Sequence, residues 1–141
     1  MKQHQNKAFY TSMLVAILLI MTGITISGID GGADEWEVPN RFKHMENPVE
    51  ADNQSARIGR SLYRRNCSDC HGSAGAGDGP EAADLETPLR DFGSEEVQNQ
   101  TDGELFYKTS EGRDEMPGFK ADLFDEDIWH IVNYIRTLKK D

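Results

Sequence analysis

Cys67, Cys70 and His71 stand at a spacing that could hold a prosthetic group. Two thiols three positions apart can each form a thioether to one of the two vinyl groups on a porphyrin edge. An imidazole that follows directly is held beneath the iron, where its neutral nitrogen can bind. The pattern is therefore typical of covalent c-type haem attachment, with Cys67 and Cys70 as the thioether residues and His71 as the proximal iron ligand.

Two other kinds of site use a pair of cysteines at this spacing, and both fit the sequence less well. A structural zinc site needs about four ligands, whereas the chain has 2 cysteines and 4 histidines in total. His4 and His44 precede the region that looks folded, and His130 falls inside an expected helix. A redox dithiol is expected beside alternating strands and helices, and no such alternation is visible. The residues favour haem over a zinc site or a dithiol.

The second iron ligand is sought among the 5 methionines. Three of them lie in the apolar N-terminal segment, and Met45 lies in an acidic stretch before the folded region. Met116 alone falls in the folded region, in an irregular loop with charged residues before it and Pro117-Gly118 after it. A thioether stabilises ferrous iron and raises the potential. Met116 is therefore expected as the distal ligand, with His130 or an open site as alternatives.

The chain divides into three parts that have different compositions. Residues 1–29 have a basic start at Lys2 and Lys7 and no charge over residues 8–29, which is long enough to cross a bilayer core of about 30 Å. Residues 30–51 are acidic, aperiodic and rich in Gly and Pro, as in a tether. Residues 52–141 hold the elements that look folded and form the expected haem domain.

The N-terminal segment predicts export from the cytoplasm. We expect a retained transmembrane helix over residues 1–29, with the haem domain on the periplasmic or outer side of a bacterial cell membrane, because the basic residues precede the apolar run. The alternative is a cleaved signal peptide, which would leave a soluble periplasmic protein.

The elements that must position the haem motif are helices. Apolar spacing predicts a helix over residues 53–66 that leads directly into Cys67. Thr101 and Glu104 have the form of a capping box at the start of a second helix. An apolar stripe over residues 125–138 predicts the last helix. The fold class is therefore all-α, with three to four helices around one haem. The apolar fraction of 37% is low for a self-sufficient core, and a bound porphyrin would supply the missing apolar centre.

Over residues 52–141 the chain resembles the small bacterial class I cytochromes c. The residues that carry the resemblance are Gly59 and Tyr63, the haem motif Cys67, Cys70 and His71, the pair Met116-Pro117, and Trp129 with residues 134–138. The resemblance implies the cytochrome c fold, one covalently attached haem c with its iron, and close packing of Tyr134 near Gly59. It also implies that the carbonyl of Pro80 accepts a hydrogen bond from His71 Nδ1–H and so orients the ring.

Electron transfer is the function that these expectations favour. With both axial positions filled, no small-molecule substrate reaches the iron, and no catalytic acid–base or nucleophilic constellation is visible. Residues 30–141 carry all 25 acidic side chains and, once Lys2 and Lys7 are set aside, 13 of the 15 basic ones, a net charge of −12. Such a field repels nucleic acid and steers basic docking surfaces of redox donor and acceptor proteins. A subunit of a membrane-bound oxidoreductase and a haem enzyme with a displaceable methionine are the alternatives.

Overall fold

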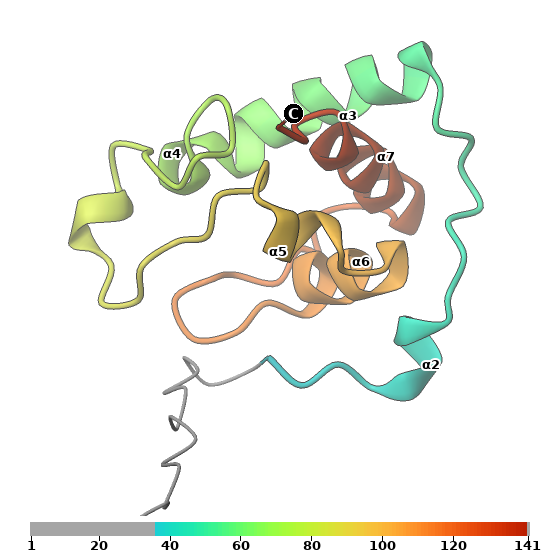
Figure 1. Ribbon diagram of the computed structural model, residues 1–141, viewed down its shortest axis with the longest axis horizontal. Helices are drawn as coiled ribbons and strands as arrows, with labels where there is room; N and C mark the ends of the chain where they lie inside the picture. Colours follow the sequence, from blue (N-terminus) through green and yellow to red (C-terminus); the bar gives the residue numbers. More distant parts are fainter. Residues whose placement is uncertain (1–35, 141) are drawn as a thin grey trace, which may run out of the picture. The chain divides into compact units, whose positions relative to one another are not determined.

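The computed structural model describes residues 36–140, and its regular structure there is helical (Figure 1). The elements in chain order are α2 (Asn40–Lys43), α3 (Asn53–Asn66), α4 (Ser68–His71), the 3-10 helix η1 (Ala82–Asp84), α5 (Glu95–Gln98), α6 (Asp102–Glu111) and α7 (Asp125–Arg136). Arg113 and Met116 form one isolated β-bridge within these residues. The expected all-α class is confirmed for the described part of the chain.

Helices α3 and α7 cross at a glycine. A Cβ atom on Gly59 would lie only 1.8 Å from the carbonyl oxygen of His130 and 2.9 Å from Cβ of Tyr134. Only a residue without a side chain allows the two backbones to approach this closely. The expected packing of Tyr134 near Gly59 is confirmed, and α3 has the bounds that its apolar spacing predicted.

Local capping explains where the other long helices begin. Thr101 Oγ1 accepts a hydrogen bond from Glu104 N–H (3.2 Å), and the Glu104 carboxylate accepts one from Thr101 N–H (2.7 Å). This reciprocal pair is the predicted capping box, and α6 starts directly after it. Phe124, at the N-cap of α7, has no acceptor in its side chain. There the carboxylate of Asp127 accepts the Phe124 N–H instead (3.2 Å).

The hydrophobic core lies around α7, which packs against α3 on one side and against α6 on another. The rings of Phe106 and Trp129 stack with centroids 4.2 Å apart. The other buried members are Leu62, Val97, Leu105, Ile128, Ile131, Val132 and Ile135. Four of these lie on α7, so the apolar stripe that predicted this helix is the stripe that it buries.

The segment before α3 packs on the domain from residue 37 onwards. We expected a tether over residues 30–51, but the compact unit starts at Glu37. Val38 is buried, and Phe42, Met45 and Val49 pack against the core. We call residues 37–51 the strap. Its apolar side chains are irregularly spaced, which is why no periodicity revealed their packing.

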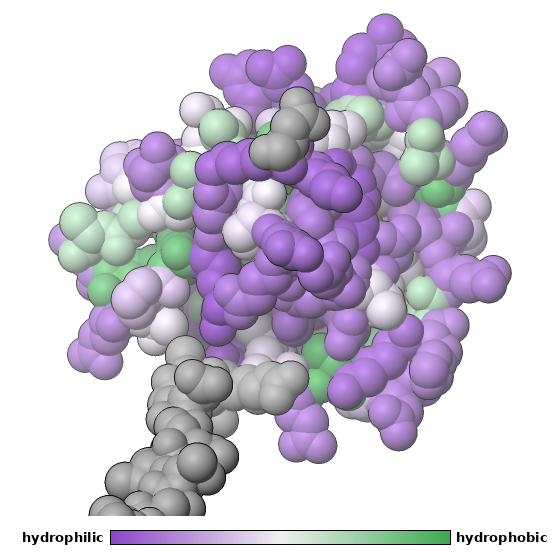
Figure 2. Space-filling view, in the orientation of Figure 1, coloured by the Kyte–Doolittle hydropathy of each residue, from purple (hydrophilic) through white to green (hydrophobic). Residues whose placement is uncertain are grey.

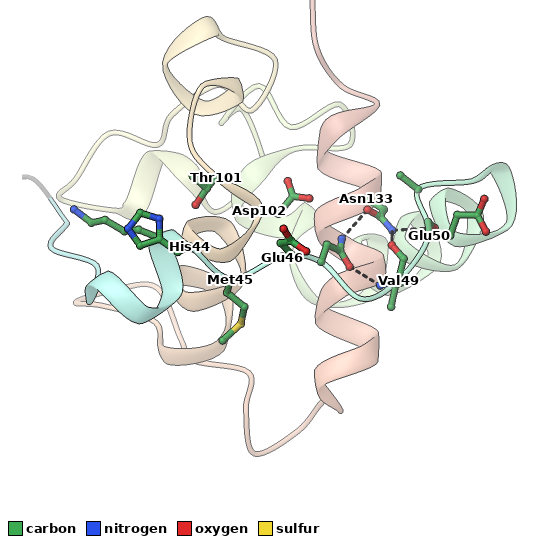
Figure 3. Close-up of a pocket in the computed structure, with 11 residues that line it drawn as sticks. His44, Met45, Glu46, Val49, Glu50, Thr101, Asp102 and Asn133 are labelled. Carbon is green, nitrogen blue, oxygen red and sulfur yellow. Dashed lines mark hydrogen bonds between the residues drawn. The ribbon is translucent and has the colours of Figure 1, made fainter.

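The strap is fastened by the amide of Asn133 on α7. Asn133 Nδ2 donates to the carbonyls of Val49 (3.2 Å) and Glu50 (3.3 Å) and to Ser55 Oγ (2.8 Å), and its Oδ1 accepts from Asn47 Nδ2 (2.8 Å). An open pocket of about 540 Å³ lies between the strap, the start of α6 and α7 (Figure 3). None of the predicted site residues lines this pocket.

Figure 2 shows a surface that is mostly hydrophilic on the viewed face, as the net charge of −10 predicts. Hydrophobic residues gather at the left of this view, over the part of the chain where Figure 1 draws η1 and the loop after it. Apolar surface thus lies on the segment that follows the haem motif.

The predicted membrane anchor over residues 1–29 lies outside the described residues. Among residues 36–140, no helix has the length and the apolar composition that a membrane crossing requires.

Candidate haem site

The haem motif forms a single helical turn at the end of α3. Cys67 is both the last cap of α3 and the first cap of α4. Its N–H donates to the carbonyl of Tyr63 (2.8 Å), and its own carbonyl accepts from His71 N–H (2.8 Å). The sequence therefore brings both thiols and the imidazole together on one turn, anchored to the longest helix of the domain.

The loop after α4 folds back along this turn. The carbonyls of three consecutive motif residues accept hydrogen bonds from it: Gly77 N–H to His71 O (2.9 Å), Gly79 N–H to Cys70 O (3.0 Å) and Glu81 N–H to Asp69 O (2.9 Å). The approach is too close for side chains, because a Cβ on Gly79 would lie 2.2 Å from the Asp69 carbonyl oxygen. Gly72, which starts the loop, has a φ of +77° that favours glycine. The loop therefore fixes the backbone of the haem motif.

The surroundings of His71 favour its neutral imidazole. Its ring stacks on that of Phe92, with centroids 4.5 Å apart and an angle of 25° between the planes. Burial lowers the pKa of His71. Its Nδ1 atom is buried and has no hydrogen-bond partner. A neutral imidazole is the form that can bind a metal, and the lowered pKa favours this form of His71.

The expected hydrogen bond from His71 to Pro80 is not formed in the structure, since Nδ1 has no partner. The peptide that follows Pro80 is held in the loop by the hydrogen bond from Glu81 N–H to the Asp69 carbonyl. Pro80 itself is exposed, whereas His71 Nδ1 is buried.

The two cysteines form no disulfide with each other, and the pKa values of both thiols are raised. Burial, with a smaller effect of Cys70, raises the pKa of Cys67 to about 12. Burial and a hydrogen bond to the Glu81 carboxylate (3.5 Å) raise the pKa of Cys70. A redox dithiol needs a lowered pKa, because the thiolate is the reactive form. Within residues 36–140 no three His, Cys, Asp or Glu side chains converge as a metal site. The structure therefore favours neither the dithiol nor zinc.

Met116 lies in a tight turn that follows α6. Arg113 and Met116 exchange two backbone hydrogen bonds of 2.9 Å each, and Asp114 between them has a φ of 52°. Asp is one of the few residues that adopt this left-handed conformation readily. The Met116 side chain is half-buried. Figure 1 draws this loop, in orange, on the same side of the view as α4, with α2 on the opposite side.

His130, the alternative ligand, is engaged between α3 and α7. Its Nδ1 shares a hydrogen bond with Ser55 Oγ (2.8 Å). Its Nε2 lies 4.0 Å from a carboxylate oxygen of Glu126. The structure thus gives His130 a role in joining the two helices.

The sequence did not reveal that three further residues support the site. Phe92 stacks on His71, Tyr63 donates from its hydroxyl to the Gly72 carbonyl (2.7 Å), and Glu115 binds a backbone segment near residue 86. Tyr63 was noted only as an aromatic on α3. No local signal identified Phe92 or Glu115, because both act on residues at least 20 positions away.

Comparisons with solved structures show the same fold. A chain of the Kuenenia stuttgartiensis reducing HAO-like protein complex aligns with a TM-score of 0.61 and 24% identity, over 66% of this chain and 47% of that chain. This chain thus spans about half the length of that relative. The KustC0563 c-type cytochrome aligns with a TM-score of 0.52 and 31% identity, over 58% of this chain and 98% of that chain. The comparison with curated proteins found no match.

A family model described as cytochrome c oxidase, cbb3-type, subunit III matches residues 54–135. This match includes the haem motif, Met116 and nearly all of α7, and it spans more than half of the 141 residues. The chain therefore belongs to that family, as a small bacterial mono-haem cytochrome c that carries covalently bound haem c with its iron.

Proposed function

We propose that the protein is a one-electron carrier in which Cys67 and Cys70 hold the haem by thioether bonds and His71 and Met116 are the axial ligands. The observation that carries the proposal is the ordered haem motif. Three of its backbone carbonyls are bound by the following loop, and the half-buried imidazole of His71 has a lowered pKa, which favours its neutral form. When bound, the haem iron supplies a one-electron couple between its ferric and ferrous states.

The chain's own residues set the conditions of this transfer. His71 keeps its orientation through the stack with Phe92. Met116 belongs to the turn at residues 113–116, which is closed by two backbone hydrogen bonds between Arg113 and Met116. A thioether ligand raises the potential, and two protein ligands leave no position for a substrate. Outer-sphere transfer to another protein is the function that such a site supports.

We further propose that the partners dock through basic surfaces. Residues 30–141 have a net charge of −12, and the face in Figure 2 is mostly hydrophilic. A negative field raises the rate of encounter with a basic partner, and salt weakens it. The rate of electron transfer to a basic partner should therefore fall as the ionic strength rises.

For its location, we propose an anchor at residues 1–29 in a bacterial cell membrane, with the haem domain on the periplasmic or outer side. The apolar run after Lys2 and Lys7 supports this proposal. Because the compact unit starts at Glu37, the connecting chain is residues 30–36, which reach at most about 25 Å when fully extended. Such a carrier would serve partners close to the membrane surface. Membranes washed with carbonate should retain the full-length haem protein, whereas a soluble form that starts near residue 30 would contradict the anchor.

A second candidate function is that of a cytochrome c subunit in a membrane-bound oxidoreductase. The description of the matching family names such a subunit, and one structural relative comes from a protein complex. Purification of the protein from its native membranes distinguishes these two functions. A carrier is isolated alone, whereas a subunit is isolated with fixed partners.

The test of the haem assignment uses denatured protein. Wild-type chain should retain haem on a denaturing gel and show the added mass of one haem, while the double variant Cys67→Ser/Cys70→Ser should lose both. Met116→Ala should remove the weak sulfur-to-iron band at the red end of the ferric spectrum, lower the potential and admit imidazole. If Met116→Ala leaves spectrum and potential unchanged, the axial assignment is wrong and His130 is the next candidate.

A further inference from the structure

The carboxylate of Glu115 binds the backbone of a distant segment. Both of its oxygens accept from Glu86 N–H at 3.1 Å, and Oε2 also accepts from Thr87 N–H at 3.1 Å. Hydrogen bonds to a charged acceptor are stronger than those between neutral groups. Glu115 is exposed, and this contact gives it a specific role.

On one side, the contact holds the loop that carries Met116. The base of this loop is closed, because a Cβ on Gly112 would lie 2.3 Å from Gly118 N, and Phe119 N–H donates to the carbonyl of Thr109 (3.1 Å). Its tip is closed by the backbone pair between Arg113 and Met116. Glu115 lies within that tip, directly before Met116. A constraint on Glu115 is therefore transmitted to the methionine through a short, closed ring of backbone.

On the other side, the contact reaches the segment that frames His71. This segment starts at Glu81, whose N–H binds Asp69 in the haem motif. It ends at Phe92, whose N–H binds the Gly75 carbonyl (2.7 Å) and whose ring stacks on His71. Residues 86 and 87 lie between these two attachments. Glu115 thus joins the loop of the proposed distal ligand to the framework of the proposed proximal ligand.

We infer that Glu115 is a positioning residue that keeps Met116 on the iron by fastening the loop at residues 112–118 to the backbone of residues 86 and 87. The inference rests on the proposed ligation by Met116. Its prediction is that loss of the carboxylate lets Met116 leave more easily, so that an external ligand competes better for the ferric iron.

The experiment measures imidazole binding to the ferric holoprotein by its absorption spectrum. Glu115→Ala should raise the apparent imidazole affinity about tenfold, the effect of losing hydrogen bonds to a charged group, and weaken the sulfur-to-iron band. Glu115→Gln, which keeps one acceptor oxygen, should give a smaller increase. The matched control is Glu46→Ala, which removes an exposed carboxylate in the strap, outside residues 81–92 and 112–118. The control should bind imidazole as the wild type does.

A second background shows whether Glu115 acts through Met116. Met116→Ala alone should bind imidazole tightly, and Glu115→Ala should add nothing to it. An equal gain from Glu115→Ala in both backgrounds would overturn the positioning role. If Met116→Ala itself leaves imidazole binding unchanged, the proposed ligation fails, which is a different result from the failure of Glu115 alone.

Amide hydrogen exchange supplies a readout that does not depend on the iron. In Glu115→Ala the amides of Glu86 and Thr87 should exchange faster than in the wild type, because their acceptor is gone. Unchanged exchange at both amides would show that the contact does not hold this segment, and would overturn the inference. Faster exchange together with wild-type imidazole affinity would also overturn it, since the contact would then not act on Met116.

Discussion

The hydroxyl of Tyr63 donates a hydrogen bond of 2.7 Å to the backbone carbonyl of Gly72, the residue that follows the haem motif. Tyr63 lies on α3 and is fully buried. Burial is the largest cause that raises its pKa above the usual value, so the phenol stays a proton donor over the working range of pH. This bond fixes the point at which the chain leaves His71 and turns back along α4.

Tyr63→Phe should therefore loosen the turn while it preserves the packing of the ring. A buried carbonyl that loses its donor costs about 1–3 kcal/mol, and we expect the free energy of unfolding of the holoprotein to fall by that amount in urea titrations. Tyr134→Phe, which removes a hydroxyl from the neighbouring ring 5.1 Å away, is the matched control. Equal stability of Tyr63→Phe and wild type would show that the bond contributes nothing.

Gly59→Ala should disrupt the crossing of α3 and α7. Its Cβ would overlap the His130 carbonyl, which is backbone and cannot rotate aside. Overpacking of this kind costs about 1–3 kcal/mol or more, although alanine favours helix formation elsewhere. The control is Arg60→Ala on the exposed face of the same helix. Thermal unfolding should show a lower midpoint for Gly59→Ala only, and a raised midpoint would contradict the close approach.

Asn133→Ala should release the strap from the domain. The substitution removes the acceptor of Asn47 and the donor for the carbonyls of Val49 and Glu50. Trypsin cleavage after Arg41 or Lys43 in the strap should become faster, because cleavage follows the population of the open form. Asn99→Ala, at an exposed asparagine, should leave the cleavage rate unchanged. A resistant strap in Asn133→Ala would mean that the apolar contacts of Phe42 and Met45 hold it alone.

The ion pair of Asp91 with Lys140 should make part of the stability depend on pH. A hydrogen bond from Lys140, and next one from Gly93 N–H (2.8 Å), lower the pKa of Asp91. Because the folded pKa lies below the unfolded value of about 4, this contribution is full above that value and is lost as the pH falls through the folded pKa.

Asp91→Asn should accordingly be less stable than wild type at pH 7, and the difference should shrink as the pH falls below about 4. The difference in stability is measured from the midpoints of urea unfolding of both proteins at a series of pH values. Asp84→Asn, at an exposed carboxylate on η1, is the control and should show no such trend. A difference between Asp91→Asn and wild type that stays constant with pH would exclude the ion pair as its cause.

The sequence by itself determined the elements that depend on near neighbours. The spacing of apolar residues predicted α3 at its observed bounds, and Thr101 with Glu104 predicted the start of α6. The haem motif could be recognised for the same reason, since both thiols and the imidazole lie within one helical turn. The fold class followed from these local patterns, and the approach of Tyr134 to Gly59 followed from the family resemblance.

Only the tertiary structure decided how distant segments support that motif. Phe92 reaches His71, Glu115 reaches residues 86 and 87, and Asn133 reaches the strap. Each contact joins residues that are about 20 to 85 positions apart, so neither periodicity nor a capping pattern encodes it. The strap was predicted to be a tether because its apolar residues follow no repeat. Pro80 was expected as an acceptor from the family resemblance, which does not determine the path of the loop in this chain. Local sequence sets the helices and the attachment residues, while the packing of loops against them decides which side chains hold the site in place.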